Sequence, residues 1–405
     1  MNKNLIFLTM SRITDIERRG IYSDLLRKFR SEGWGVYIVA PRERSLGMPT
    51  ELVVNNNVHI LGVKTLNLQK TSTIEKGIGQ VSVEFLYKKA IKKYLKGIQF
   101  DLILYSTPPI TFPKVVSYLK RHNPAAKTYL LLKDIFPQNA VDIGMMTKTG
   151  VKGVLYMFFR KKEKKLYALS DFIGCMSPAN VEYVLKHNPE IDASRVEVAP
   201  NSVELTEADL QPITDINAIR TRYGLPVDKP IFIYGGNLGK PQGIPFLIKC
   251  LDANSDRSDC HFLVIGTGTE LPKIKAWFEE RKPHSVTVMD GLPRKEYEEL
   301  ANSCDVGMIF LDHRFTIPNY PSRLLPYLMT KKPVLAVTDP ICDTGKIAEE
   351  NGYGLWCESN SVECFTSTVN KMLQSDMDEM GEKGNAFLKA NYQVQNTYNT
   401  IVKHV

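Results

Sequence analysis

The chain has 405 residues, of which 43% are hydrophobic and 24% are charged. This length suggests two domains, and the composition is that of a globular protein, with no apolar run near the ~20 residues that cross a bilayer. The seven cysteines, an odd number without a Cys-x-x-Cys pair, argue for a reducing cytoplasm and against a disulfide framework or structural zinc.

The charge is distributed unevenly between the two halves of the chain, whose overall net charge is +8. Residues 1–200 contain 31 Lys and Arg against 17 Asp and Glu, a net charge of +14. Residues 201–405 contain 21 against 27, a net charge of −6. A strongly basic half favours a polyanionic partner, which can be nucleic acid, an anionic membrane surface or a phosphorylated substrate.

The first half alternates between apolar strands and amphipathic helices. It opens on a strand rather than a signal peptide, because its first apolar run is short and lacks a small-residue cleavage site. Predicted strands cover 5–9, 33–40 (with a leading turn), 58–63, 100–105, 128–132, 171–176 and 196–198, and helices cover 15–32, 82–97 and 152–169. This alternation predicts a parallel sheet with helices on both faces. Ligands of such sheets bind beyond the carboxyl ends of the strands, which makes Ser106, Thr107, Lys133 and Asp134 candidate site residues.

The predicted helix at 152–169 combines bulky apolar and aromatic residues with a basic cluster that contains Lys161, Lys162, Lys164 and Lys165. This combination fits an element at an anionic lipid interface. The alternative is a core helix whose lysines face solvent, which is a common arrangement. The charge of the whole half favours the membrane interpretation.

A stretch with little apolar periodicity, 203–228, marks the domain boundary, and a second alternating series follows it. Its predicted strands cover 230–234, 261–265, 286–289, 305–310 and 333–337, its helices cover 244–251 and 271–280, and a further helix opens at 291–296. The polar helices at 366–405 are expected to pack back across the interface. The sequence therefore predicts two separately wound α/β domains.

The stretch 318–337 reads as a loop, a short helix and a buried strand. Ser322 is a candidate N-cap, because its hydroxyl can accept from a free amide of the first turn. A helix start that carries Arg323 is a candidate site for a phosphate or pyrophosphate. An ordinary capped helix whose Arg323 points into solvent explains these residues equally well.

Two glycine-rich turns follow strands in the second half. Gly235-Gly-Asn-Leu-Gly239 stands where a backbone can approach a phosphate closely, although a structural tight turn explains the same glycines. Neither this turn nor Gly266-Thr-Gly268 forms a dinucleotide-binding or Walker motif. The histidines show no metal-ligand spacing, and Asp134 is either a base or a structural carboxylate at a strand end.

The order of these pieces resembles glycosyltransferase family 4, the retaining nucleotide-sugar transferases of the GT-B fold. The chain looks most like the subgroup that builds bacterial capsule and O-antigen repeat units, and it resembles N-acetylfucosamine-type transferases. In the first half, Asp134-Ile-Phe-Pro137 is similar to that subgroup's Asp-x-Trp-Pro motif. In the second half the succession consists of the two glycine turns, Asp290-Gly-Leu-Pro293, Cys304-Asp-Val-Gly-Met308, Pro321-Ser-Arg-Leu-Leu325, Lys332-Pro-Val334 and the segment 343–354.

The resemblance implies an α/β protein of the GT-B fold, whose two Rossmann-like domains face each other across a cleft. Residues 1–203 would bind the acceptor and face the membrane, 204–385 would bind the nucleotide-sugar, and 386–405 would form a helix that crosses back to the N-terminal domain. The enzyme would be cytoplasmic and peripheral at the inner face of the plasma membrane, and it would need no metal or other cofactor. Its partners would be a UDP-linked sugar donor, a saccharide on polyprenyl pyrophosphate as acceptor and an anionic membrane surface, with no nucleic acid.

The resemblance also implies roles for individual residues. The catalytic group would consist of Asp134, Lys133 and Arg323, with Arg323 neutralising the leaving diphosphate and Asp134 orienting the acceptor or stabilising positive charge on the sugar. Lys161, Lys162, Lys164 and Lys165 would contact the acceptor or the membrane. The donor-binding residues would be Gly235, Gly236, Asn237, Leu238, Lys240, Gln242, Gly266, Leu292, Pro321, Ser322 and Leu324.

The chain departs from the family pattern at positions that contact the donor. Asn237-Leu238 and Gln242-Gly243 replace the usual Arg-Leu and Lys-Gly. Pro318 and Pro326 stand where the family has paired glutamates, of which the second holds the ribose. Two alternatives therefore stay open, namely a non-catalytic GT-B partner protein and a GT-B epimerase that acts on a free nucleotide-sugar.

Overall fold

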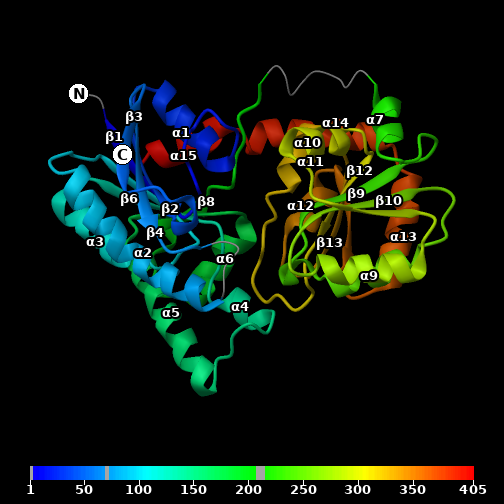
Figure 1. Ribbon diagram of the computed structural model, residues 1–405, viewed down its shortest axis with the longest axis horizontal. Coiled ribbons are helices and arrows are strands. Elements are labelled where there is room, and N and C mark those ends of the chain that lie inside the picture. Colours follow the sequence, from blue (N-terminus) through cyan, green and yellow to red (C-terminus); the bar gives the residue numbers. More distant parts are fainter. Residues whose placement is uncertain (1–2, 69–72, 207–214) are drawn as a thin grey trace. The chain divides into compact units, whose positions relative to one another are not determined.

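The computed structural model describes residues 3–68, 73–206 and 215–405. The chain forms two compact units, one of Met1–Glu204 with Gln393–Val405 and the other of Leu205–Tyr392 (Figure 1). Each unit is an α/β domain with its own sheet, which confirms the predicted fold class. Among the described residues, no helix is long and apolar enough to cross a membrane.

The first unit is built, in its described part, on an eight-stranded sheet in the order β3-β4-β2-β1-β5-β6-β7-β8. Neighbouring strands are parallel except β3, which runs antiparallel to β4. Every residue of β5 is buried, as expected for a parallel strand covered on both faces. The strands are β1 Asn4–Leu8, β2 Gly35–Glu43, β3 Glu51–Asn55, β4 Val58–Thr65, β5 Leu102–Ser106, β6 Lys127–Leu132, β7 Phe172–Cys175 and β8 Val196–Val198.

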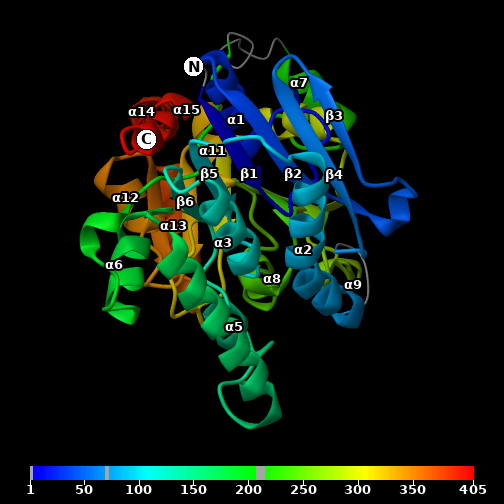
Figure 2. The same ribbon diagram turned by 90° about the vertical axis from the view of Figure 1, so that its left-hand side faces the viewer.

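Helices cover both faces of this sheet, because successive strand residues point to opposite sides. Ile6 and Leu8 of β1 belong to one core, whereas Leu5 and Phe7 belong to another on the opposite face. The helices are α1 Ile21–Ser31, α2 Thr73–Tyr94, α3 Pro113–His122, α4 Gln138–Asp142, α5 Gly150–Leu169 and α6 Pro178–His187, with short 3-10 turns at Arg44–Leu46 and Ala193–Arg195. Helices α2, α3 and α5 lie next to one another over the first of these cores (Figure 2).

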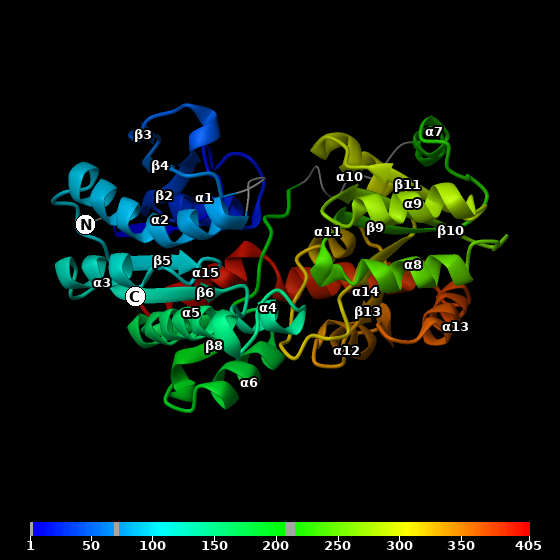
Figure 3. The same ribbon diagram turned by 60° about the horizontal axis from the view of Figure 1, so that its bottom comes forward.

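The second unit is built, among its described residues, on six parallel strands in the order β11-β10-β9-β12-β13-β14. The strand order reverses between β9 and β12, which is where open sheets of this kind bind ligands. Helices α8 and α9 lie side by side over one face (Figure 3). The strands are β9 Ile231–Asn237, β10 His261–Thr267, β11 Val286–Asp290, β12 Val306–Phe310, β13 Val334–Thr338 and β14 Gly354–Glu358. The helices are α7 Ile216–Arg222, α8 Ile244–Ala253, α9 Leu271–Arg281, α10 Arg294–Asn302, α11 Leu324–Met329, α12 Thr344–Glu350, α13 Val362–Leu373 and α14 Met377–Asn391, with a 3-10 turn at Lys240–Gln242.

The last helix, α15 (Val394–Val402), returns to the first unit. It packs against α1, and the indole nitrogen of Trp34 donates to the hydroxyl of Tyr398 at 3.2 Å. A single bridge between Val203 and Gln393 brings the two crossing segments together. The predicted return of the C-terminal helix to the N-terminal domain is therefore confirmed.

Several predicted boundaries differ from the structure, mostly at helix ends. Helix α1 begins at Ile21 rather than at residue 15, and α2 begins at Thr73 rather than at residue 82. The edge strand β3 was not predicted, and the proposed boundary region 203–228 contains α7. The prediction that Ser322 caps a helix is wrong, because α11 begins at Leu324 and Arg323 occupies the cap position, where no side chain caps the helix.

Gly266 on β10 is paired with Gly236 on β9, and the two backbones touch there. The Cβ of an alanine at position 266 would overlap the carbonyl oxygen of Gly236. We expect Gly266→Ala to lower the free energy of unfolding by about 2 kcal/mol or more, as overpacking does in a rigid site.

Gly77→Ala in α2 is the matched control for this substitution. Nothing lies within 4 Å of the Cβ that it would add, and alanine favours a helix over glycine by about 0.5–1 kcal/mol. Denaturant unfolding of both variants measures the difference. Equal stability of Gly266→Ala and the wild type would contradict the close approach of β9 and β10.

Candidate functional site

The first group of site residues lies at the carboxyl end of β9, beside the point where the strand order of the second unit reverses. Gly236 has a φ of +119°, which a residue with a side chain rarely adopts. A Cβ at this position would lie 3.8 Å from Nη2 of Arg323. The bare backbone of the glycine turn and the guanidinium of Arg323 therefore face each other.

The guanidinium of Arg323 is held in place by an aromatic ring. Its central carbon lies 4.4 Å from the centroid of the Tyr234 ring, a cation–π geometry. Its Nη1 is buried and has no hydrogen-bond partner in the described structure. Because buried polar atoms are normally satisfied, an unpaired arginine nitrogen beside exposed backbone indicates a site for an anionic acceptor of hydrogen bonds.

The side chain of Gln242 closes the glycine turn. Its Oε1 accepts from Nδ2 of Asn237 at 3.1 Å and from the backbone amide of Gly239 at 3.2 Å. These bonds fix the loop between β9 and α8. The structure therefore brings Gly235, Gly236, Asn237, Gln242 and Arg323 together.

The other predicted donor-binding residues fall into two groups. The side chains of Leu238 and Leu324 are fully buried, so these residues belong to the core of the second unit and can offer a ligand only their backbone. Gly266 lets β10 approach the backbone of Gly236 closely, because it has no Cβ. Lys240, Ser322 and Pro326 are exposed, Leu292 and Pro321 are half-buried, and Pro318 is buried.

Two aromatic residues of this site were missed by sequence reasoning. Tyr234 supports Arg323, and the phenol of Tyr297 packs directly on Gly235, where an added Cβ would overlap it. Tyr234 stands immediately before the glycine turn, so its position was a usable signal. Tyr297 comes from α10, and no local pattern connects it to the turn.

The second group of site residues lies in the first unit, at the carboxyl ends of β5 and β6. Oγ1 of Thr107 accepts from the backbone amide of Lys133 at 3.0 Å and donates to the carbonyl of Asp134 at 3.3 Å. These bonds hold the two strand ends together. Ser106 and Thr107 are buried, whereas Lys133 and Asp134 are half-buried. The four residues picked out by strand position are thus adjacent.

Asp134 and Lys133 have different partners and shifted pKa values. Oδ1 of Asp134 accepts from Nδ2 of Asn139 at 2.7 Å, and burial raises the pKa of Asp134 to about 6 in spite of this bond. Nζ of Lys133 donates to the carbonyl of Ala199 at 2.8 Å, and burial lowers the pKa of Lys133 to about 7. Both groups therefore titrate close to neutral pH, which is common at functional sites.

Three of the four predicted lysines of α5 are exposed, namely Lys161, Lys164 and Lys165. Lys162 is half-buried and pairs with Glu84 of α2 at 2.9 Å, and the exposed Lys164 pairs with Glu190 at 3.1 Å. In the described part of the chain, no group of three or more His, Cys, Asp or Glu side chains is arranged to hold a metal ion.

Comparison with known proteins identifies the class of enzyme. Residues 215–393 match the family model described as "Glycosyl transferases group 1". The "Probable glycosyltransferase WbjE" of Pseudomonas aeruginosa is 23% identical over 375 residues, which cover 92% of this chain and 89% of that protein. The "Putative colanic acid biosynthesis glycosyl transferase WcaI" of Escherichia coli (strain K12) is 22% identical over 187 residues, 45% of each chain.

A solved structure shares the fold of the whole chain. It is described as "Trehalose-6-phosphate from E. coli bound with UDP-2-fluoro glucose" and matches with a TM-score of 0.74 at 10% identity, over 99% of this chain and 98% of that one. The chain is therefore a glycosyltransferase with the GT-B fold, and its residues 215–393 match the group 1 family, as the sequence predicted.

The raised pKa of Asp134 predicts a pH-dependent effect on stability. Between about pH 4 and about pH 6 the unfolded chain has lost this proton while the folded chain keeps it, so stability falls as the pH rises through this window and stays lower above it. We expect Asp134→Asn to be more stable than the wild type at pH 8 by up to about 3 kcal/mol, and equally stable near pH 3.5.

Asp228→Asn is the control for this prediction, because Asp228 is exposed and its substitution should leave stability unchanged at both pH values. Denaturant unfolding at each pH measures the effect. If Asp134→Asn gains nothing between pH 3.5 and pH 8, the carboxylate is not penalised by burial.

Proposed function

We propose that this group 1 glycosyltransferase moves a sugar from a UDP-linked donor to a saccharide carried on polyprenyl pyrophosphate, in the synthesis of a surface polysaccharide. The observation that carries the proposal is the unpaired, buried Nη1 of Arg323, whose guanidinium faces the bare backbone of Gly236 through Nη2. A diphosphate supplies the acceptor oxygens and the negative charge that such a site lacks. The polysaccharide assignment is supported by the similarity to WcaI, a putative glycosyl transferase of colanic acid biosynthesis, and the donor class by the UDP-sugar bound in the E. coli structure.

In this proposal the second unit binds the donor and stabilises the leaving group. Arg323 neutralises the charge that develops on the diphosphate as the glycosidic bond breaks, and amides of the glycine turn donate to its oxygens. Tyr234 fixes the guanidinium before the substrate arrives, so little reorganisation is needed in the transition state. Transfer with retention places the acceptor hydroxyl on the same face of the sugar, where the departing phosphate takes its proton.

The first unit would supply the acceptor side of the reaction. Asp134 has a pKa of about 6, so it is mostly ionised at neutral pH, and its carboxylate can orient an acceptor hydroxyl or stabilise positive charge on the sugar. Nζ of Lys133 is engaged by the Ala199 carbonyl. We therefore assign Lys133 to positioning the strand end that carries Asp134 rather than to contact with the substrate.

The ribose of the donor would be bound without the family's usual glutamate. The side chain of Pro326 has no hydrogen-bond acceptor and its ring is exposed, so it cannot replace a carboxylate that accepts from the ribose hydroxyls. We propose that the backbone near Leu292 reads the base, and that the ribose is held by groups other than this glutamate.

The acceptor assignment is supported by an exposed apolar surface on the first unit, which we call the apolar patch. Helices α2 and α5 are linked by the ion pair between Glu84 and Lys162, and Nζ of Lys162 lies 5.9 Å from the Phe158 ring. Seven large apolar side chains of these two helices are 40–72% exposed. The patch consists of Ile78, Val81, Phe85, Val154, Leu155, Met157 and Phe158.

Lys161 and Lys165 extend the outer face of α5 beyond the apolar patch, since they follow Val154, Met157 and Phe158 at helical spacing. Apolar side chains flanked by basic ones are typical of a surface that rests in a lipid interface. Such contact would hold the enzyme at the membrane that carries a lipid-linked acceptor.

Substitution of Arg323 tests the donor site. Because a hydrogen bond to a charged group contributes roughly 1.5–3 kcal/mol, we expect Arg323→Gln to weaken UDP binding and raise the donor KM by roughly 10- to 100-fold, and to lower kcat as well. Arg222→Gln, which changes an exposed arginine of the same unit, should leave both constants unchanged.

UDP release is measured with a UDP-sugar panel, with and without a polyprenyl-pyrophosphate saccharide. Unaltered UDP affinity in Arg323→Gln would refute the proposed site, and turnover without any acceptor would indicate an epimerase.

Substitution of the apolar patch tests membrane contact. We expect the triple variant Phe85→Ser, Val154→Ser, Met157→Ser to lose most of its co-sedimentation with anionic vesicles, because these side chains supply buried apolar area at the interface. The control carries three exposed apolar residues from elsewhere, as Val54→Ser, Ile216→Ser, Val227→Ser. If both triple variants sediment like the wild type, the apolar patch does not bind lipid.

A further inference from the structure

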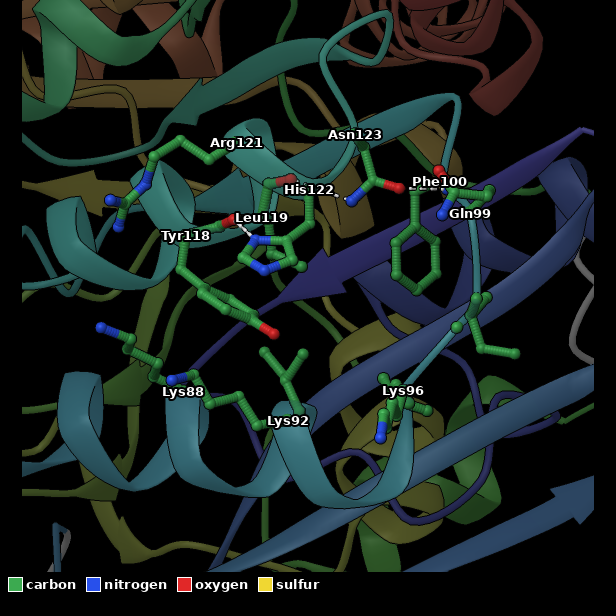
Figure 4. A pocket seen from close by; sticks show the side chains of 14 residues that line it. Lys88, Lys92, Lys96, Gln99, Phe100, Tyr118, Leu119, Arg121, His122 and Asn123 are labelled. Carbon is green, nitrogen blue, oxygen red and sulfur yellow. Dashed lines mark hydrogen bonds between the residues drawn. The ribbon is translucent and has the colours of Figure 1, made fainter.

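A cavity with a strongly basic wall lies at the far edge of the first unit from Asp134. It has a volume of about 710 Å³ and lies between the C-terminal ends of α2 and α3 and the loop that enters β5 (Figure 4). Asp134 follows the carboxyl end of β6, whereas this cavity is at the amino ends of β5 and β6. The cavity therefore takes no part in the site described above, although its volume is in the range of ordinary ligand pockets.

The charge of this cavity is of one sign. Its lining includes the basic residues Lys88, Lys92, Lys96, Arg121 and His122 and contains no Asp or Glu. In the part of the chain that the structure describes, neither the three lysines nor Arg121 forms an ion pair with a carboxylate. The neighbouring Lys120 does so, with Asp171 at 2.9 Å, and so does Lys162 with Glu84. The three lysines and Arg121 are thus unpaired cations that line one cavity.

An alternative explanation is that these cations only complement the negative C-terminal ends of two helices. That effect is small, about 0.3–1 kcal/mol, and is confined to the last turn of a helix. Lys88 lies well inside α2, which ends at Tyr94. Moreover, Lys88 and Lys92 are four residues apart within the helix, a like-charge spacing that destabilises it. The helix ends therefore do not explain the whole wall.

The structure holds this basic wall in place. Nζ of Lys88 and Nζ of Lys92 lie 5.7 Å and 5.2 Å from the centroid of the Tyr118 ring, so both ammonium groups gather at one aromatic face (Figure 4). Nδ1 of His122 donates to the carbonyl of Tyr118 at 2.9 Å, which leaves Nε2 free to contact a ligand. Asn123 ties the end of α3 to the strand entry by accepting from the amide of Phe100 at 2.8 Å.

We propose that this cavity binds a phosphate group, from either a soluble oligophosphate compound or a phospholipid headgroup. A phosphate offers several acceptor oxygens and about two negative charges, which matches several donors that converge from two helices. The volume of about 710 Å³ suits one headgroup or a di- or triphosphate. The site is separate from the proposed diphosphate contact of Arg323, which lies in the other unit.

The test compares two triple variants of the full chain that change the net charge equally. The pocket variant is Lys88→Gln, Lys92→Gln, Arg121→Gln. The control variant is Lys89→Gln, Lys93→Gln, Lys186→Gln, which removes three exposed lysines that do not line the cavity. Each variant is first checked for a native unfolding transition, and Tyr118→Ala, which removes the aromatic wall without changing charge, provides an independent second probe.

Binding is measured by calorimetry with inorganic pyrophosphate, and by co-sedimentation with phosphatidylcholine vesicles with and without phosphatidylglycerol. We expect the pocket variant to bind at least one probe about tenfold or more weakly than the wild type, since each lost charge-assisted contact is strong, and the control variant to bind normally. If the pocket variant loses binding to pyrophosphate alone, the ligand is a soluble phosphate compound. If it loses binding to anionic vesicles, the ligand is a phospholipid headgroup. The proposal is overturned if the wild type binds neither probe, or if the control variant loses as much as the pocket variant.

Discussion

The unsatisfied guanidinium of Arg323 is the feature on which the account of this enzyme depends. Its Nη1 is buried without a partner, its central carbon lies 4.4 Å from the centroid of the Tyr234 ring, and its Nη2 faces the backbone of Gly236. The N–H groups of Nη1 therefore lack a hydrogen-bond acceptor, and a bound anion would supply one. The glycines of the turn serve the same end, because Gly236 adopts a positive φ and Gly266 lets the two strand ends approach each other. Donor binding and local packing therefore both require glycine at these positions.

The excess of basic residues in the first half does not form a uniform surface. Some of these residues are paired within the unit, as Lys162 is with Glu84 and Lys120 is with Asp171. Others form the wall of the cavity between α2 and α3, where no carboxylate accompanies them. Helices α2 and α5 both place apolar residues toward their N-terminal ends and lysines beyond them. This arrangement separates an apolar surface near the Asp134 edge from a basic cavity at the opposite edge.

Much of the fold was predictable from the sequence, because buried parallel strands are continuous apolar runs and their order follows from the alternation with helices. The position of Asp134, Lys133 and Thr107 at strand ends was likewise predictable. What could not be predicted depends on contacts between distant residues. Nothing local shows that Tyr297 packs on Gly235 or that Lys162 is paired with Glu84. The prediction of an N-cap at Ser322 was wrong because the helix starts at Leu324, later than the capping pattern indicates.

The most direct measurement of the central claim is a crystal structure of the protein with UDP. The account predicts that the diphosphate lies within hydrogen-bond distance of Nη1 of Arg323 and of an amide in the 235–239 turn, with the Tyr234 ring still beneath the guanidinium. A well-ordered UDP bound elsewhere, with Nη1 of Arg323 still unpaired, would contradict it.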